Sequence, residues 1–284
     1  MTVHNYILTL SCPDRTGIVH SVSGCLLNLH GNIVEAQQFG DTETQHFFLR
    51  VHFTLPNCTD IAQLQSSFTP IAEKFGMQAQ FYDAQQKPRV LILVSRQGHC
   101  LNDLLFRTHS GLLPIEIAGI VSNHNDYADL ANSYHVPFSH LPVTPDTKTE
   151  QEQQILQLID RERVDLVVLA RYMQVLSHDM CQALAGRAIN IHHSFLPGFK
   201  GARPYHQAHA RGVKIIGATA HYVTADLDEG PIIEQDIEHV THALTAQDLA
   251  RVGSDIESMV LARAVRSHIE HRILLNGQRT VVFR

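Results

Sequence analysis

The chain has 284 residues, and its 22 Lys and Arg against 28 Asp and Glu give a formal charge of −6. This length suits about two domains, and a hydrophobic share of 44% is typical of a folded protein rather than a disordered one. A net negative chain also lacks the basic surface that non-specific nucleic-acid binding requires. The 20 histidines make the charge depend strongly on pH below neutrality.

The N-terminus has neither the basic segment nor the apolar core of a secretory signal. The longest apolar runs, such as Val90–Val94 and Leu166–Ala170, are much shorter than the ~20 residues that a membrane span needs. The five cysteines are odd in number, widely spaced and without a CxxC pair, so they predict free thiols. We therefore expect a cytoplasmic protein with no membrane attachment.

Residues 5–82 predict the order β-α-β-β-α-β, which is that of a ferredoxin-like sandwich. A breaker-rich turn, Cys12–Gly17, separates the first strand from a helix with one apolar face. The expected strands are 6–10, 33–39, 47–55 and 77–82, and the expected helices start at Ile18 and Ile61. The third strand is the clearest, because its apolar residues alternate strictly from Phe47 to Leu55.

The polar run Asp83–Arg89 lacks periodicity and contains a proline, so it is the expected linker between domains 1–84 and 85–284. After it, strands and helices alternate, which predicts a doubly wound, mostly parallel sheet. The expected strands are 90–94, 115–121, 164–170 and 188–192, and the expected helices are 100–109, 126–134, 149–161, 178–185 and 204–211. A strand pair at 215–223 and 231–237, a long helix capped at Thr245–Asp248 and a hairpin at Asn276–Gly277 complete the chain.

Asn190 and His192 stand at the carboxyl end of an expected apolar strand, on the same face of it. In α/β sheets this end of parallel strands is where ligand crevices lie. Asn supplies a neutral hydrogen-bond donor and His a titratable group, a pair suited to holding an oxyanion and moving a proton. A lone histidine at a strand end is nevertheless more often a structural residue, so this pair alone is weak.

Two further places carry chemistry. The loop Thr224–Gly230 contains three carboxylates, which could reach a histidine on a neighbouring strand, although acidic loops are usually just solvated. The segment Leu169–Leu176 is a strand end that runs into irregular structure. The pairs His206 with His209 and His239 with His242 have no nearby carboxylate or cysteine pattern, so no metal site is expected.

The second region resembles the folate-dependent formyltransferase fold family. The resemblance rests on Asn190-Ile191-His192, on the following His193–Pro197, and on Asp228–Pro231 further along. The first region resembles an ACT domain, with Cys12–Ile18 as its opening. Together the two resemblances cover nearly the whole chain, and the order of the two domains is typical of the branch of the family that hydrolyses its formyl donor.

The resemblance implies the roles of particular residues. Asn190, His192 and Asp228 would be catalytic. Asp228 would position and help deprotonate a water molecule, His192 would stabilise the oxyanion and carry a proton to N10, and Asn190 would donate a hydrogen bond to that oxyanion. The implied substrate-binding residues are Met173, Gln174, Val175, Leu176, Ser194, Pro197, His221, Thr224, Ala225 and Asp226. The implied effector-binding residues are Asp14, Arg15, Thr16, Gly17, Ile18, Asn32 and Ile33. The effector would be an amino acid such as glycine or methionine, although the first domain could instead serve only assembly into a homodimer or homotetramer.

The loop Ser95–Cys100 decides between branches of the family. It contains a single glycine, so its side chains crowd the backbone amides that would cradle a phosphate. This disfavours a phosphorylated amine as acceptor and leaves water, while the negative charge disfavours the tRNA-modifying branch. The expected reaction is hydrolysis of 10-formyltetrahydrofolate to formate and tetrahydrofolate, which would supply formate for purine synthesis without a cofactor. Transfer to an unidentified amine, and an amino-acid sensor on an inactive scaffold, are the alternatives.

Overall fold

The computed structural model of the chain describes residues 3–196 and 204–284, which form two compact units. Unit 1 comprises the residues up to Lys87 together with Ser267–Arg284, and unit 2 comprises Pro88–Arg266. The passage from Lys87 to Pro88 lies within the expected linker. Residues 267–284 join unit 1, whereas a single boundary after residue 84 would place them in the second domain.

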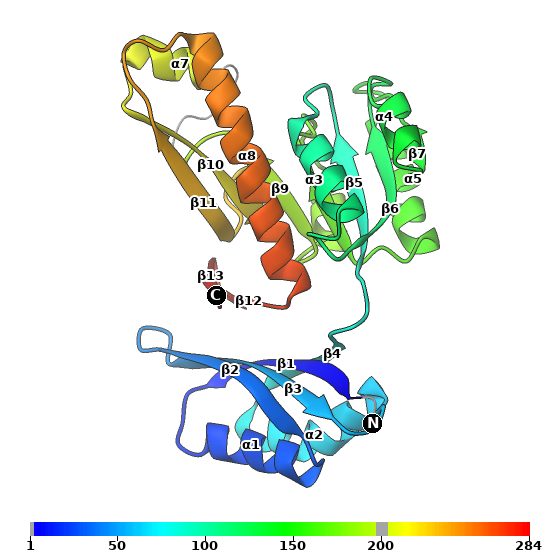
Figure 1. The fold of residues 1–284 in the computed structure, drawn as a ribbon, viewed down its shortest axis with the longest axis vertical. Coiled ribbons are helices and arrows are strands. Elements are labelled where there is room, and N and C mark those ends of the chain that lie inside the picture. Colours follow the sequence, from blue (N-terminus) through cyan, green and yellow to red (C-terminus); the bar gives the residue numbers. More distant parts are fainter. Residues whose placement is uncertain (1–2, 197–203) are drawn as a thin grey trace. The chain divides into compact units, whose positions relative to one another are not determined.

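Unit 1 has the β-α-β-β-α-β order that the sequence predicts (Figure 1). Its elements are β1(His4–Pro13), α1(Ile18–Asn28), β2(Asn32–Asp41), β3(His46–Leu55), α2(Ile61–Phe75) and β4(Gln78–Asp83). The antiparallel sheet has the order β2-β3-β1-β4, so β2 is an edge strand. Alternate residues of β3, such as Leu49, Val51 and Phe53, are buried with both helices in one apolar core.

The last residues of the chain cover part of the opposite face of this sheet. The strands β12(Ile273–Asn276) and β13(Arg279–Val282) form the expected hairpin at Asn276–Gly277. Leu274 and Phe283 pack with Phe48, which points away from the main core. The Arg50 guanidinium donates to the carbonyl of Glu270 at 3.1 and 3.0 Å. This hairpin therefore stabilises unit 1 rather than the unit that precedes it in the chain.

Unit 2 contains a seven-stranded sheet in the order β11-β10-β9-β8-β5-β6-β7. Its strands are β5(Arg89–Val94), β6(Glu116–Ser122), β7(Phe138–His140), β8(Leu166–Leu169), β9(Ala188–His192), β10(Ile215–Tyr222) and β11(Ile232–His239). Strands β5 to β9 run parallel, whereas β10 and β11 are antiparallel to their neighbours. The predicted parallel-rich sheet is thus confirmed, while the three-residue β7 is too short to leave a periodic pattern in the sequence.

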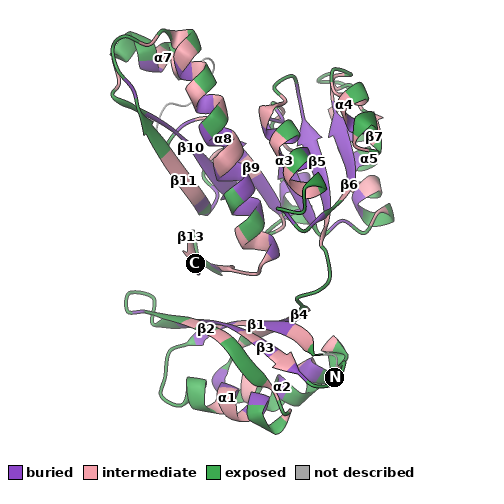
Figure 2. Cartoon of the chain, viewed as in Figure 1, coloured by how far each residue is buried: buried purple, intermediate pink, exposed green. Residues whose placement is uncertain are grey.

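Helices cover both faces of this sheet. They are α3(His99–His109), α4(Ala128–Ser133), α5(Lys148–Arg161), α6(His178–Ala183), α7(Pro204–Arg211) and α8(Ala246–Ile269). Helices α3 and α8 lie in front of the sheet in the view of Figure 1, and α5 and α6 pack with Leu91, Leu93 and Val167 on one face. Strands β5 and β8 are therefore buried (Figure 2), as near-continuous apolar runs predict.

The start of α8 has the reciprocal cap that the sequence predicts. The backbone N–H of Asp248 donates to Thr245 Oγ1 at 3.2 Å, and the backbone N–H of Thr245 donates to the Asp248 carboxylate at 3.0 Å. All five cysteines lie in the described part of the chain and are free thiols. Within the described residues, none of the helices combines the length and the apolar character that crossing a bilayer would demand.

Candidate active site

One cavity of about 340 Å³ lies in unit 2 beside the end of β8, strand β9 and the loop after β10. Asn190, His192 and Asp228 line it together, although Asp228 is far from the other two in sequence. The predicted substrate-binding residues that also line it are Met173, Gln174, Val175, Leu176, His221, Thr224, Ala225 and Asp226. Ser194 does not line the cavity, and Pro197 lies outside the described residues.

His192 is held from both sides. Its Nδ1 lies 3.2 Å from Asp228 Oδ1, and its Nε2 lies 2.9 Å from the hydroxyl of Ser194. Ser194 is buried behind the imidazole, where its carbonyl also accepts from Thr219 Oγ1 at 3.0 Å. The ring orientation of His192 is therefore fixed, and both of its nitrogens have partners.

Asp228 has a left-handed backbone with a φ of 58°, which few residues other than glycine adopt. This turn aims the carboxylate back at two histidines, His192 at 3.2 Å and His221 at 3.8 Å. Burial alone would raise the pKa of Asp228, but His192 and His221 beside the carboxylate outweigh it and hold that pKa well below its usual range. The carboxylate is therefore ionised at neutral pH and is a weak proton acceptor.

Asn190 is oriented by His221, its partner across the β9–β10 pair. The Nδ1 of His221 lies 2.9 Å from the carbonyl of Tyr222, which can only accept, so Nδ1 carries the proton. In the neutral ring, Nε2 is then an acceptor, and it lies 3.2 Å from Asn190 Nδ2. One N–H of the Asn190 amide is thereby fixed, and the second remains able to donate to a ligand.

Two residues that line the cavity have no role in the sequence prediction, Arg171 and His193. Arg171 follows β8 with a φ of 63° and has the only buried side-chain nitrogen or oxygen, Nη1, that lacks a partner among the described residues. His193 stacks on His192 with 4.8 Å between ring centroids. Both residues stand within the motifs that the sequence singles out, and the position of Arg171 directly after a buried parallel strand could have identified it.

Burial, the charge of Arg171 and the neighbouring His192 lower the pKa of His193 to about 4. Glu257 and Asp228 act in the opposite direction without overcoming them. His193 is therefore a neutral imidazole at physiological pH, facing the same cavity as the charged Asp228.

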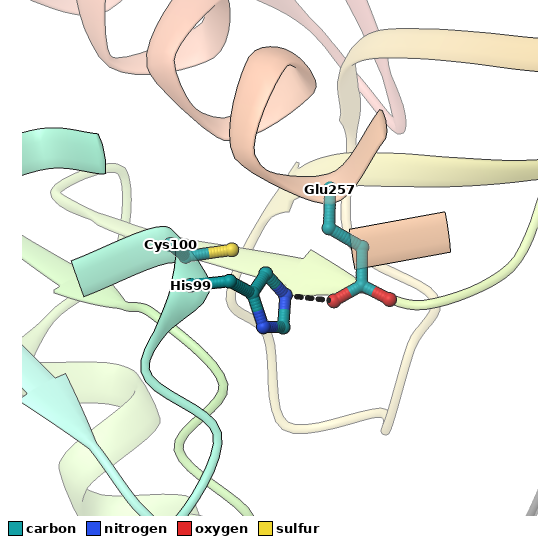
Figure 3. A group of neighbouring side chains, drawn as sticks. All are labelled: His99, Cys100 and Glu257. Atoms are coloured by element: carbon teal, nitrogen blue, oxygen red, sulfur yellow. Dashed lines mark hydrogen bonds and ion pairs between the residues drawn. The ribbon is translucent and has the colours of Figure 1, made fainter. Parts of the chain in front are cut away.

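Glu257 of α8 forms a buried ion pair with Arg171 and also contacts His99, as Figure 3 shows for His99, Cys100 and Glu257. Its carboxylate lies 2.7 Å from His99 Nε2, accepts from the Tyr205 hydroxyl at 2.6 Å, and lies 3.3 Å from Arg171 Nε. His99, Cys100 and Glu257 offer ligand atoms within 4.8 Å of one another, a spacing that a metal ion could use. Burial, however, raises the pKa of the Cys100 thiol, and the guanidinium already neutralises the carboxylate. The ion pair between Arg171 and Glu257 therefore accounts for the buried carboxylate in this cluster.

The loop after β5 is covered by an aromatic ring. A Cβ placed on Gly98 would lie 2.3 Å from the ring of Tyr127, whose hydroxyl donates to the carbonyl of Arg96 at 2.6 Å. Ser95 Oγ meanwhile accepts from the backbone of Met173 at 3.0 Å. The loop is therefore braced by side chains, which agrees with the prediction that it is a poor phosphate cradle.

The predicted effector residues do not form one site within a single chain. Strands β1 and β2 both pair antiparallel with β3, so they point the same way. Asp14, Arg15, Thr16, Gly17 and Ile18 follow the end of β1, whereas Asn32 and Ile33 stand at the start of β2. Because a strand of this length spans about 30 Å, the two groups lie at opposite ends of the sheet.

Comparisons with known proteins show the family to which the chain belongs. A model of the formyl transferase family matches residues 88–265. A formyltetrahydrofolate deformylase from Corynebacterium sp. (strain P-1) is 51% identical over 280 residues, covering 98% of each chain. The crystal structure of a formyltetrahydrofolate deformylase from Burkholderia mallei has a TM-score of 0.95 and 53% identity, covering 99% of this chain and 100% of that one.

A more distant likeness covers only part of the chain. Glycinamide ribonucleotide transformylase 1 from Symbiobacterium toebii has a TM-score of 0.66 and 32% identity, and the match covers 72% of this chain and 97% of that one. The nearly full-length matches are instead with deformylases, whose length includes a counterpart of unit 1. The chain therefore belongs to the formyl transferase family and, within it, to the formyltetrahydrofolate deformylases.

Proposed function

We propose that this chain hydrolyses 10-formyltetrahydrofolate to formate and tetrahydrofolate. The observation that carries the proposal is the convergence of Asn190, His192 and Asp228 on one cavity whose other walls come from Met173–Leu176 and Thr224–Asp226. These walls include several exposed apolar side chains, which suit the flat rings of a folate. The Tyr127 ring over Gly98 supports water rather than a phosphorylated amine as the acceptor.

The reaction adds water to the formyl carbon and breaks the bond to N10. The free N–H of the Asn190 amide donates to the oxyanion that forms, and His192, held by its contact with Asp228, stabilises the same negative charge. Asp228 positions the water and holds His192. We do not assign the removal of the water proton to Asp228, because its depressed pKa makes it a weak base.

Formate release without any added acceptor tests this function. The wild-type chain is expected to release formate from 10-formyltetrahydrofolate. Asp228→Asn and His192→Ala are expected to abolish this release, although their far-UV circular dichroism spectra stay those of a folded protein. Asn190→Ala is expected to lose on the order of 100-fold in kcat, the usual effect of losing one oxyanion donor. Near-normal turnover in Asp228→Asn would refute the assignment. Release only after an amine is added would instead identify a transferase.

Unit 1 is proposed to be an ACT domain that binds an amino acid between two copies of the chain. The split of the predicted residues between the two ends of one sheet supports binding across a pair, because a second copy can bring one end beside the other. Glycine and methionine are the first candidates, since both are tied to one-carbon supply. A thermal-shift screen of amino acids tests this, because a specific ligand must raise the unfolding temperature by mass action.

A homodimer or homotetramer is proposed for the assembly. The edge strand β2 exposes Ile33, Val34 and Phe39, with exposed fractions of 39%, 55% and 46%. A long apolar edge strand tends to pair with another chain. Light scattering of Val34→Lys tests this surface: a smaller species than the wild type supports it, and an unchanged mass contradicts it.

A cellular compartment and a metabolic role are proposed as well. A cytoplasmic location is proposed, which is supported by the five free thiols, four of them buried. Release of formate and tetrahydrofolate would supply formate to purine synthesis and balance the pool of one-carbon carriers. No cofactor has a role in the proposed step, which uses water and side chains of this chain.

A further inference from the structure

We propose that His193 is the group that takes the proton from the attacking water and then delivers it to N10. This inference rests on the hydrolase activity proposed above, and it gives His193 the two proton transfers that the sequence prediction gave to Asp228 and His192. It follows from the placement of His193 in the cavity, from its ring nitrogens, which make no hydrogen bond with the residues that the structure describes, and from the charges that surround it.

The first step is a comparison of the two adjacent histidines. Both line the cavity, and their rings stack with an interplanar angle of 27°. The nitrogens of His192 are engaged by Asp228 and Ser194. His193, by contrast, makes no side-chain hydrogen bond with any residue in the described part of the chain. Of the two, only His193 can therefore accept a proton without first breaking a contact.

The second step concerns the groups around His193. Arg171 stands beside it after β8, His192 precedes it on β9, Asp228 faces it from the loop after β10, and Glu257 of α8 lies behind Arg171. The buried guanidinium opposes protonation of His193, and Glu257 fixes that guanidinium through an ion pair at 3.3 Å. Arg171 and Glu257 are therefore positioning residues, which keep His193 neutral in the resting site.

The third step explains why an imidazole that binds its proton weakly suits this substrate. N10 is an aromatic amine, so it is weakly basic and leaves only if an acid protonates it. A protonated histidine next to a fixed positive charge gives up its proton readily. The same arrangement that keeps the resting imidazole neutral thus makes its protonated form a strong acid.

The proposed sequence balances in atoms and charge. The water oxygen bonds to the formyl carbon as His193 takes one water proton, and the carbonyl electron pair moves to the formyl oxygen, beside Asn190 and His192. The carbonyl then reforms, the bond from carbon to N10 breaks, and N10 takes the proton from His193. Formic acid leaves and ionises, which releases one proton to solvent and returns His193 to its neutral form.

Steady-state formate release as a function of pH tests this role. The substrate is an N10-formyl analogue with carbon in place of N5, because N5 would otherwise attack the formyl group in acid. His193→Gln keeps a polar side chain but cannot carry the proton. We expect it to lose about 100-fold or more in kcat, with KM within a few-fold of the wild type. We also expect the wild type to lose activity below about pH 4, and this acid limb to be absent in the variant.

The matched control is His140→Gln, which changes an exposed histidine at the end of β7 and is expected to leave kcat unchanged. A second variant, His193→Ala, is measured with added imidazole, which should restore part of the activity by entering the vacated space. A His193→Gln enzyme with kcat within a few-fold of the wild type and the same acid limb would overturn the proposal. So would a folded His193→Ala enzyme whose loss imidazole does not relieve. Absence of formate release by the wild type would instead refute the proposed function.

Discussion

The guanidinium of Arg171 and the carboxylate of Glu257 form an ion pair at 3.3 Å in which the two side chains are only 7% and 1% exposed. One follows β8 and the other stands in the middle of α8, so the pair joins the carboxyl end of a central strand to a helix that covers the sheet. Taking two charges out of water is costly, and the pair is tolerated because Gln97 accepts from Arg171 while His99 and Tyr205 contact the Glu257 carboxylate. Only Arg171 Nη1 stays without a partner among the described residues.

Removing one partner of this pair should destabilise unit 2 strongly. Glu257→Ala leaves the Arg171 charge buried without its partner, so we expect the free energy of unfolding to fall by about 3–5 kcal/mol. Urea unfolding of the full chain measures it. Arg251→Ala breaks an exposed pair with Asp248 and is the control, with an expected loss below about 1 kcal/mol. Equal losses in the free energy of unfolding for the two substitutions would show that the buried pair contributes no more to stability than the exposed pair.

Asp228, His192 and Ser194 follow one another as in a hydrolytic triad, but Ser194 does not line the cavity. We therefore expect Ser194→Ala to keep formate release within about tenfold of the wild type, because it loses only one contact that orients His192. A nucleophilic serine would instead lose at least about 10⁴-fold. Mass spectrometry of the enzyme during turnover adds a second check, since the proposed reaction has no formyl-enzyme intermediate.

The packing of Tyr127 on Gly98 predicts a pair of substitutions with opposing effects. Gly98→Ala places a methyl group 2.3 Å from the Tyr127 ring, so the ring must move, and we expect a loss of about 1–3 kcal/mol in unfolding free energy. In a Tyr127→Ala background the same substitution has open space and should cost much less. Unfolding of the four proteins of this cycle measures the coupling, and additive effects would contradict the packing.

Asp41 links stability to pH in unit 1. Its carboxylate accepts hydrogen bonds from the backbone of Glu43, from Thr44 and from Asn276, and together these outweigh burial and lower its pKa from 3.8 to about 2. A lowered pKa means that the contribution to stability is present above the ordinary value and is lost as the pH falls through the folded value.

The corresponding test compares Asp41→Asn with the wild type across pH. We expect the variant to be less stable at pH 6, and the difference to vanish as the pH falls toward 2, where the wild-type carboxyl is also protonated. Thermal unfolding midpoints at several pH values measure this. Glu43→Gln, which removes an exposed partner of Arg279, serves as the control and should show no such convergence. A difference that is constant with pH would contradict the assigned linkage.

Much of the fold could be predicted from local patterns. The alternation of apolar residues from Leu49 to Leu55 and the near-continuous apolar run at Val90–Val94 identify strands, because burial on one face or on two leaves a different periodicity. The strand β7 escaped prediction because three residues carry no period. The hairpin at Asn276–Gly277 was predicted, but the surface on which it packs was not. Nothing in the residues of the hairpin shows that they pack against Phe48 of β3.

The sequence by itself determined the two-region organisation, the strand that carries Asn190 and His192, and the acidic loop that carries Asp228. Only the tertiary structure decided which nitrogens are engaged. It placed Ser194 behind His192 rather than in the cavity, and it paired Arg171 after β8 with Glu257 of α8. It also left the ring of His193 free of hydrogen bonds within the described residues. The physical reason is that hydrogen bonding and burial depend on residues far apart in the chain, and no spacing along one strand can reveal them.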